Sequence, residues 1–379
     1  MKLPPYPKRD RRKGQAPVSI RRSDGRSPRM ECLAASGSRQ KNLTIWAAFP
    51  SRGKETLSVS KCDRNFRPMT GRSHSAGNLR QGARAMERQL YGTTVYDIAS
   101  AQLSASFCPG MGGRLLVFRA KNGSDIVIPT EPHGFDVINW PRAGAYPLVP
   151  YHNRLARAKI AVGEDVVTLR PHPAAMPHTL HGPGHARPWM AGVHHANLFS
   201  MRLDYRADDD WPWDFHAEQV FELDGESLRL TMTVENRSTR PMPAGMGWHP
   251  YFASRHPIVA DAGYLWPHGP DYLPGGERSR TAGNDQPVYV ETAYFEAWGR
   301  ARISLGGDVT ATMTASPPFD FLVVHRGAPS HICVEPTTHV ANAWNLGLSP
   351  SQTGAALLSP GERLTGEIEI RLSGKCDGH

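Results

Sequence analysis

The chain has 379 residues, enough for one large domain or two ordinary ones, and a formal net charge of +9. The charge is uneven. Residues 1–85 hold 20 of the 44 basic and 5 of the 35 acidic residues, a net +15, so residues 86–379 carry −6. This mildly acidic main body lacks the basic excess expected of a nucleic-acid-binding domain.

The cysteines and the hydropathy of the chain exclude further classes of protein. The cysteines are few and show no CxxC spacing, which excludes a zinc knuckle and a disulfide framework: Cys32, Cys62, Cys108, Cys333 and Cys376. This pattern favours a reducing compartment, so we expect a cytoplasmic protein. No stretch approaches the roughly 18–20 apolar residues of a membrane span, so we expect no membrane partner.

Residues 1–88 are rich in Arg, Ser, Gly and Pro, and their apolar residues occur singly. Such a segment buries too little apolar surface to offset the entropy of ordering, so we predict that it is disordered. It could be a nucleic-acid-binding arm, a targeting peptide, or a non-native extension created by an early start codon. The sharp change of composition at Met86 favours the extension, followed by a folded domain over residues 89–374.

From residue 91 onward the sequence predicts short β-strands separated by Gly-rich turns. Asn122-Gly123 and Asp224-Gly225 are strong hairpin signals, and Gly163 lies in a third turn between apolar strands. Further strands are predicted at 301–305, 309–313, 319–325, 331–334 and 367–372. Many short strands without a long helical stripe indicate an all-β fold, a large antiparallel sandwich or barrel.

The run from Pro150 to Arg154 carries the first candidate ligand-binding residues. The guanidinium of Arg154 offers a rigid fork of donors that suits paired hydroxyls or a carboxylate. Asn153 adds an amide beside it. A lone arginine is usually a solvated surface residue, but this pairing after a Pro-rich turn favours a binding role.

A second run, from His178 to Trp189, carries histidines at 178, 181 and 185. The Gly and Pro residues between them prevent the helix that would align these side chains, and no nearby Cys or carboxylate completes a metal shell. We therefore expect no metal, but a loop that binds a polar ligand through His181. Trp189 could stack on a ligand ring or belong to the core. The aromatic run Trp211–Phe215 is expected in the core.

His249 and Glu335 are the residues most suggestive of chemistry. His249 stands between a glycine and a proline, and Glu335 ends an apolar run at 332–334. A carboxylate in such a place either faces a cleft or is paired, and burial makes it a better base by raising its pKa. An imidazole and a carboxylate that converge on one small molecule can donate and accept a proton in the same step. We predict that these two form an acid–base pair.

Several runs in the chain resemble those of the aldose 1-epimerases, the galactose mutarotase-like family. In chain order, the similar runs are residues 147–154, residues 181–184 with Trp189, residues 242–252, residues 334–336 with Asn345, and residues 358–364. The resemblance covers about residues 91–372. It implies a β-supersandwich with a sugar in a cleft on one face. It also implies an isomerase that interconverts the α and β anomers of a free aldose, without a metal or organic cofactor.

The resemblance assigns roles to the candidate residues. It implies that Glu335 takes the proton of the C1 hydroxyl while His249 protonates the ring oxygen. The ring then opens, the C1 carbonyl rotates, and the two groups reverse roles on closure. The resemblance also implies that Arg154 and His181 bind the substrate. With Asn153, Trp189 and Thr292 they make up the substrate-binding residues that we predict.

One residue departs from the family pattern. Relatives carry an Asp where this chain has Thr292, a shorter and uncharged hydrogen-bonding group. Either Glu291 or Asp271 supplies the missing carboxylate, or the substrate differs. A phosphorylated or acidic sugar is one alternative, with Arg157 and Arg187 as extra basic residues in the cleft. A non-catalytic sugar-binding protein is another, which the acid–base pair disfavours. We expect a monomer or homodimer that binds a small sugar and no nucleic acid.

Overall fold

The computed structural model describes residues 85–283 and 285–374 of the chain, so the predictions for residues 1–84 lie outside the described part. The first described strand, β1 (Met86–Leu90), pairs antiparallel with β2 (Thr93–Ala99), with Met86 opposite Asp97. This strand begins three residues before the predicted domain start at 89.

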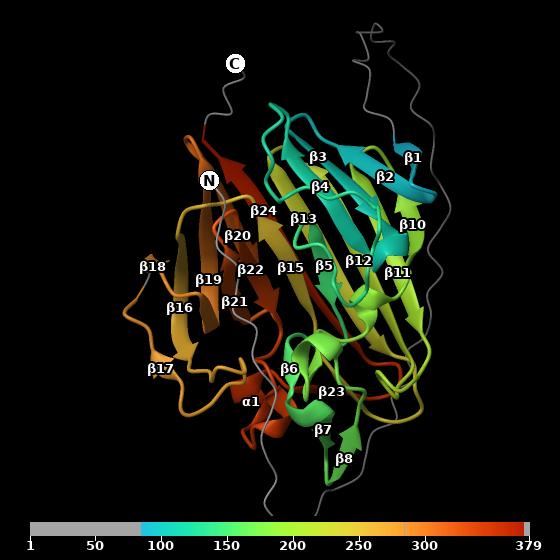
Figure 1. The fold of residues 1–379 in the computed structure, drawn as a ribbon, viewed down its shortest axis with the longest axis vertical. Coiled ribbons are helices and arrows are strands. Elements are labelled where there is room, and N and C mark those ends of the chain that lie inside the picture. Colours follow the sequence, from blue (N-terminus) through green and yellow to red (C-terminus); the bar gives the residue numbers. More distant parts are fainter. Residues whose placement is uncertain (1–84, 284, 375–379) are drawn as a thin grey trace, which may run out of the picture. The chain divides into compact units, whose positions relative to one another are not determined.

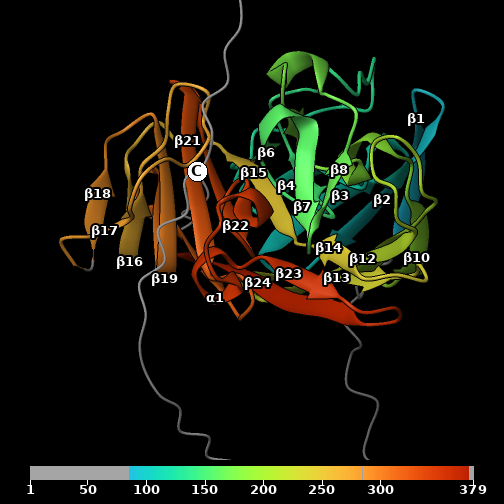
Figure 2. The same cartoon turned by 90° about the horizontal axis from the view of Figure 1, so that it is seen from below.

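The strands form two layers of antiparallel neighbours, which Figure 2 shows in a view along the strands. In the first layer, each strand pairs with the next in the order β10 (Met190–His194), β11 (Leu198–Tyr205), β12 (Phe215–Asp224), β13 (Ser227–Asn236), β24 (Arg363–Ser373), β20 (Val309–Ala315) and β19 (Thr292–Gly306).

The second layer starts from β1 and β2 (Figure 1). It continues through β3 (Leu103–Cys108), β4 (Arg114–Ala120), β5 (Ala145–Leu148), β15 (Gly247–Phe252), β22 (His331–Thr337) and β21 (Phe321–Ala328). Every residue of β15 and β22 is buried, whereas β12 alternates buried and half-buried residues.

The long strand β19 belongs to both layers. Its residues 292–296 pair with β21, and its residues 301–306 pair with β20. β19 also pairs with β16 (Ile258–Trp266), which pairs in turn with the short strands β17 (Ser279–Arg280) and β18 (Gln286–Val288). The predicted large antiparallel β-sandwich is therefore confirmed.

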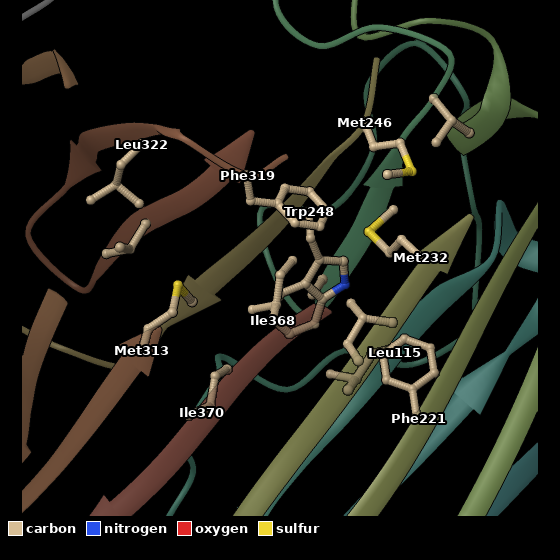
Figure 3. Packing of buried hydrophobic residues seen from close by; sticks show 14 of the residues in the cluster. Leu115, Phe221, Met232, Met246, Trp248, Met313, Phe319, Leu322, Ile368 and Ile370 are labelled. Carbon is tan, nitrogen blue, oxygen red and sulfur yellow. The ribbon is translucent and has the colours of Figure 1, made fainter. Parts of the chain in front are cut away.

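The core fills the space between the two layers. Phe107 of β3 lies 4.6 Å from Phe221 of β12 and 5.1 Å from Phe199 of β11, measured between ring centroids. Figure 3 shows the side chain of Trp248, from β15, among residues of the other layer such as Ile368. The aromatic run Trp211–Phe215 is buried in the same cluster, which confirms its predicted place in the core.

Short elements complete the described part of the chain. Three two-stranded ladders are β6 (Arg154–Leu155) with β9 (Thr179–Leu180), β7 (Lys159–Val162) with β8 (Asp165–Thr168), and β14 (Met242–Ala244) with β23 (Ala356–Leu358). The helical turns are η1 (Pro109–Met111), η2 (Ala156–Ala158), η3 (Pro173–Ala175), η4 (Gly184–Ala186), η5 (Ala343–Asn345) and α1 (Pro350–Thr353). Among the residues described, no helix has the length and apolarity needed to cross a membrane.

The predicted turns are mostly confirmed. Asp224-Gly225 joins β12 to β13, and Gly163 lies between β7 and β8. The prediction around Asn122-Gly123 was partly wrong. After this turn the chain makes an isolated bridge back to β4, between Arg119 and Asp125, and a few further backbone hydrogen bonds, such as that from Ile126 N–H to the carbonyl of Phe118. The full ladder of β4 is with β3 instead.

Candidate active site

The strand register places the two predicted catalytic side chains opposite each other. β15 and β22 are neighbours, and Gly247 pairs with Thr337 while Tyr251 pairs with Cys333. This register sets His249 against Glu335, although the two residues are far apart in the sequence. Their side chains meet, with 3.2 Å between His249 Nε2 and Glu335 Oε1. They are almost fully buried, with 6% and 3% of their surfaces exposed.

The same register extends this pair into a row across the second layer. Tyr146 of β5 is opposite His249, and Val323 of β21 is opposite Glu335. Tyr294 of β19 follows Val323. Because side chains in one row of a sheet point to the same face, these five form a continuous strip. We call it the first row, and all of its members line one pocket.

A second row lies two residues further along each strand. Here Tyr251, Cys333, His325 and Thr292 are cross-strand partners in turn. They line the same pocket, whose volume is about 440 Å³. This volume falls in the range of about 300–1,000 Å³ typical of small-molecule sites. The floor of the pocket is thus the outer face of the second layer.

Alternation along the strands separates this floor from the core. Trp248 and Val334 are the neighbours of the acid–base pair in the sequence, and both belong to the main hydrophobic cluster. Successive side chains of a strand point to opposite faces. The core residues therefore fix the strand positions from one side, and the functional side chains leave the other side.

Two tyrosine rings hold the imidazole of His249 between them. The ring of Tyr146 stacks at 4.7 Å and that of Tyr251 at 4.8 Å, with interplanar angles of 21° and 26°. His181 meets the same imidazole edge-on at 5.5 Å. This packing limits rotation of the His249 ring and keeps Nε2 directed at the carboxyl group of Glu335.

The loops around β6 and β9 bring Asn153, Arg154 and His181 to the pocket. The backbone N–H of Asn153 donates to His181 Nδ1 (3.1 Å), and the N–H of His181 donates to the carbonyl of Asn153 (2.8 Å). Asn153 Nδ2 also donates to the hydroxyl of Tyr294 (3.2 Å). Arg154 packs its guanidinium over the ring of Tyr272, 4.5 Å from the centroid.

This arrangement fixes the tautomer and the protonation state of His181. Its Nδ1 accepts a hydrogen bond, so the neutral ring carries its proton on Nε2. Burial, and then the nearby charge of His249, lower the pKa of His181 well below its usual value, which keeps the ring neutral. Asn153 and His181 both have positive φ, 54° and 63°. Such backbone conformations are sparsely populated and occur at sites where surrounding structure enforces them.

Burial shifts the two members of the acid–base pair in opposite directions. It raises the pKa of Glu335 to about 8. It also lowers the pKa of His249 well below its usual value, and the charges of His325 and Arg114 add to the lowering. Both groups thus favour their neutral forms near pH 7. The pair then holds one proton, and the 3.2 Å separation lets either Oε1 or Nε2 carry it.

One group of side chains in the described ranges has the donor types of a metal site. The ligand atoms of His249, Cys333 and Glu335 lie within 4.8 Å of one another. Cys, His and Glu are all zinc ligands. However, burial raises the pKa of the Cys333 thiol well above its usual value, and a thiol must lose its proton to bind zinc. A metal here would also occupy the lone pairs that acid–base chemistry uses.

The structure corrects the prediction for Trp189. Its side chain does not line the pocket but is buried in the main cluster, with 4% exposed. The indole N–H donates to the carbonyl of Gly184 (2.9 Å). The ring packs so closely on Gly113 that an added Cβ there would lie 2.8 Å from it. Trp189 is thus a core residue and not a ligand contact.

The charged candidates also differ from the sequence predictions. Arg157 and Arg187 do not line the main pocket, and Arg187 is bound to Asp208 and Asp210 at 2.8 and 2.6 Å. Neither Glu291 nor Asp271 lines it, so neither supplies the missing carboxylate there. Thr292 does line the pocket, and its Oγ1 is 2.8 Å from His325 Nδ1.

Sequence reasoning missed several lining residues. Arg142, His325 and His331 contribute polar groups, and Tyr146 and Tyr251 contribute the rings around His249. The tyrosines and His325 could have been found by counting alternate positions from His249 and Glu335, once the strand pairing was known. Arg142 lies in a loop before β5 and has no comparable signal.

Comparison with known proteins identifies the family. Residues 94–293 match the model of the family described as aldose 1-epimerase. The chain belongs to the aldose 1-epimerase family. The matched range includes Arg154, His181, His249 and Thr292, whereas Glu335 lies beyond it.

This aldose 1-epimerase family member has distant relatives among known proteins. The uncharacterized protein YphB of Escherichia coli K12 is 25% identical over 249 residues, which are 61% of this chain and 84% of that protein. A galactose mutarotase-like protein from Clostridium acetobutylicum has a TM-score of 0.71 at 19% identity, covering 78% of this chain and 100% of that one. A candidate aldose 1-epimerase from Escherichia coli K12 has a TM-score of 0.66 at 24% identity, covering 74% and 99%. Both structures share the fold.

Proposed function

We propose that the protein is an isomerase that interconverts the α and β anomers of an aldose. The observation that carries the proposal is the contact of His249 Nε2 with Glu335 Oε1, 3.2 Å apart on the floor of the pocket. Membership of the aldose 1-epimerase family supports it. Sugar binding alone would not require an acid–base pair, whereas anomer exchange requires one proton to be added and another removed.

The proposed reaction starts from a pair that shares one proton. Passage of this proton from Glu335 to His249 gives a carboxylate and an imidazolium within one hydrogen bond. Glu335 then takes the proton of the C1 hydroxyl while His249 gives its proton to the ring oxygen. The C1–O5 bond breaks, and C1 becomes a carbonyl. After rotation about C1–C2, the two residues act in reverse and the ring closes as the other anomer.

Each positioned proton transfer contributes about 10²–10⁴-fold to the rate. Concerted transfer avoids a free oxyanion, which the buried floor would stabilise poorly. The proposed roles of Asn153, Arg154 and His181 are to hold sugar hydroxyls by hydrogen bonds. His181 is suited to this because its neutral ring presents an Nε2–H donor. No step of this mechanism uses a metal or an organic cofactor.

The test is the approach to anomeric equilibrium of freshly dissolved α-aldoses, followed by NMR or polarimetry with and without the protein. We expect acceleration for at least one aldose of a panel of neutral and anionic sugars. Glu335→Gln and His249→Asn should each reduce the enzymatic rate by at least about 10²-fold. The exposed residues His195 and Glu226, outside the pocket, provide matched controls as His195→Asn and Glu226→Gln.

Two outcomes would contradict the proposal. The first is that no aldose is accelerated, even though titration shows that sugars bind, which would indicate a sugar-binding protein. The second is that either active-site variant keeps near-full activity while the protein remains folded, which would remove Glu335 and His249 from their assigned roles.

A further inference from the structure

The charges of the pocket lining are unbalanced. Arg142 and Arg154 both line the pocket, and Glu335 is the only carboxylate among its lining residues. Within the described part of the chain, no carboxylate lies within ion-pair distance of either arginine. By contrast, several arginines on the outer surface do form ion pairs. Since burial raises the pKa of Glu335 to about 8, this carboxyl group does not neutralise the arginines at pH 7.

The basic groups gather away from the acid–base pair. His325 lies in the second row. His331 is the first residue of β22, two residues before Cys333 of that row and on the side away from Glu335. Successive rows are about 6.7 Å apart, so these groups are separated from C1 by roughly the width of a sugar ring. Both histidines line the pocket together with Arg142.

Arg142 and the two histidines converge on one region. A Cβ atom added at Gly327 would lie 2.9 Å from His325 Nε2 and 3.7 Å from Arg142 Nη1, so both nitrogens approach the same point. Burial lowers the pKa of His331, and the charge of Arg142 lowers it further. Burial also lowers the pKa of His325, with Glu291 opposing and Arg142 adding to this effect. The histidines are thus neutral donors beside Arg142, and the charge of Arg326 also lowers the pKa of His331.

Thr292 adds no charge to this region. Its hydroxyl is 2.8 Å from His325 Nδ1. An Asp there would pair with His325 and place a negative charge beside Arg142. The neutral Thr brings no such charge, so an oxyanion of a ligand meets Arg142 and N–H donors. The carboxylate of Glu291, which acts on His325, is not among the pocket-lining residues.

We propose that Arg142, His325 and His331 form a subsite for an anionic substituent on the aldose, a carboxylate or a phosphate remote from C1. This inference rests on the proposed function, because it names the substrate class of the same pocket. The guanidinium of Arg142 binds two oxygens of the anion, and the histidine N–H groups bind the remaining lone pairs.

The test compares kcat/KM for anomer exchange of D-glucose, D-glucose 6-phosphate and D-glucuronate, with spontaneous exchange subtracted. We expect at least one anion to exceed glucose by about 10–100-fold, the range of a charge-assisted hydrogen-bond set. The ratio should fall as NaCl is raised, because Arg142 is solvent-exposed. The two anions distinguish a phosphate site from a carboxylate site.

Variants make the inference specific. Arg142→Gln should bring the ratio of anionic to neutral kcat/KM close to one, and Thr292→Asp should lower it by placing a carboxylate in the subsite. Arg202→Gln is the matched control, because Arg202 is exposed on β11 outside the pocket lining. Two results would overturn the subsite alone. One is that the wild-type protein exchanges glucose as efficiently as both anions, and the other is that Arg142→Gln leaves the ratio of anionic to neutral kcat/KM unchanged. Absence of acceleration for every sugar would instead overturn the proposed function.

Discussion

Replacing Glu335 with Gln should stabilise the folded protein at neutral pH while it removes the proposed base. Burial raises the pKa of Glu335 from 4.5 to about 8, so the folded state binds more protons than the unfolded chain between these pH values. Stability therefore falls as pH rises through this window. Within this window, each pH unit lowers the free energy of unfolding of the wild-type protein by about 1.4 kcal/mol. The loss is therefore near zero at pH 4 and about 3 kcal/mol at pH 7. Gln has a similar shape and does not ionise.

Urea unfolding of the wild type and Glu335→Gln between pH 4.5 and 8 measures this effect. The free energy of unfolding of the variant minus that of the wild type should rise by about 1.4 kcal/mol per pH unit and level off above pH 8. Other titrating groups are common to both proteins and largely cancel in the difference. Glu226→Gln, at an exposed turn, should show no such slope. A difference that stays flat with pH would refute the assignment of a buried, protonated carboxyl group.

The remaining predictions concern pH, packing and metals. kcat/KM should be level from acidic pH to about 8 and then fall tenfold per pH unit, because above the pKa of Glu335 the pair loses its one proton; a rate that rises through pH 9 would contradict this. Trp189→Phe should lower the free energy of unfolding by about 1–3 kcal/mol, since the Gly184 carbonyl loses its buried donor. Its KM should stay within about twofold of the wild type, and a large rise would return Trp189 to the binding site. EDTA should not change the rate, whereas Zn²⁺ should inhibit by occupying the lone pairs of His249 and Glu335.

Local sequence patterns predicted the architecture because half-buried strands alternate apolar and polar residues, and the tight turns between them contain Gly. The turn at Asp224-Gly225 and the strands around it were predicted for this reason and are confirmed. The prediction of a full hairpin at Asn122-Gly123 failed because a turn signal does not say how far the pairing extends. Ile126 and Val127 both direct their N–H groups to one carbonyl, that of Phe118, and the regular ladder ends there.

Motifs placed His249, Glu335, Arg154 and His181 in one pocket, because each stands out from its local sequence. Arg142 could not be found in this way. Its nearness to the histidines depends on a loop path that no periodicity encodes. Trp189 was misassigned for a related reason: beside Gly and Pro residues it has the appearance of a loop side chain, and only the tertiary structure buries it.

The alternation that sets Trp248 and His249 on opposite faces of β15 has a consequence for how this protein can change. Any substitution that repacks the interior beneath the first row shifts the strands carrying the acid and the base, so interior mutations should appear as altered turnover as well as altered stability. Residues of the second row and Arg142 at the rim of the pocket can be substituted with less effect on the positions of the acid and the base. Libraries built to redirect the protein toward other sugars should therefore vary Thr292, His325 and Arg142, and leave the first row and the interior beneath it unchanged.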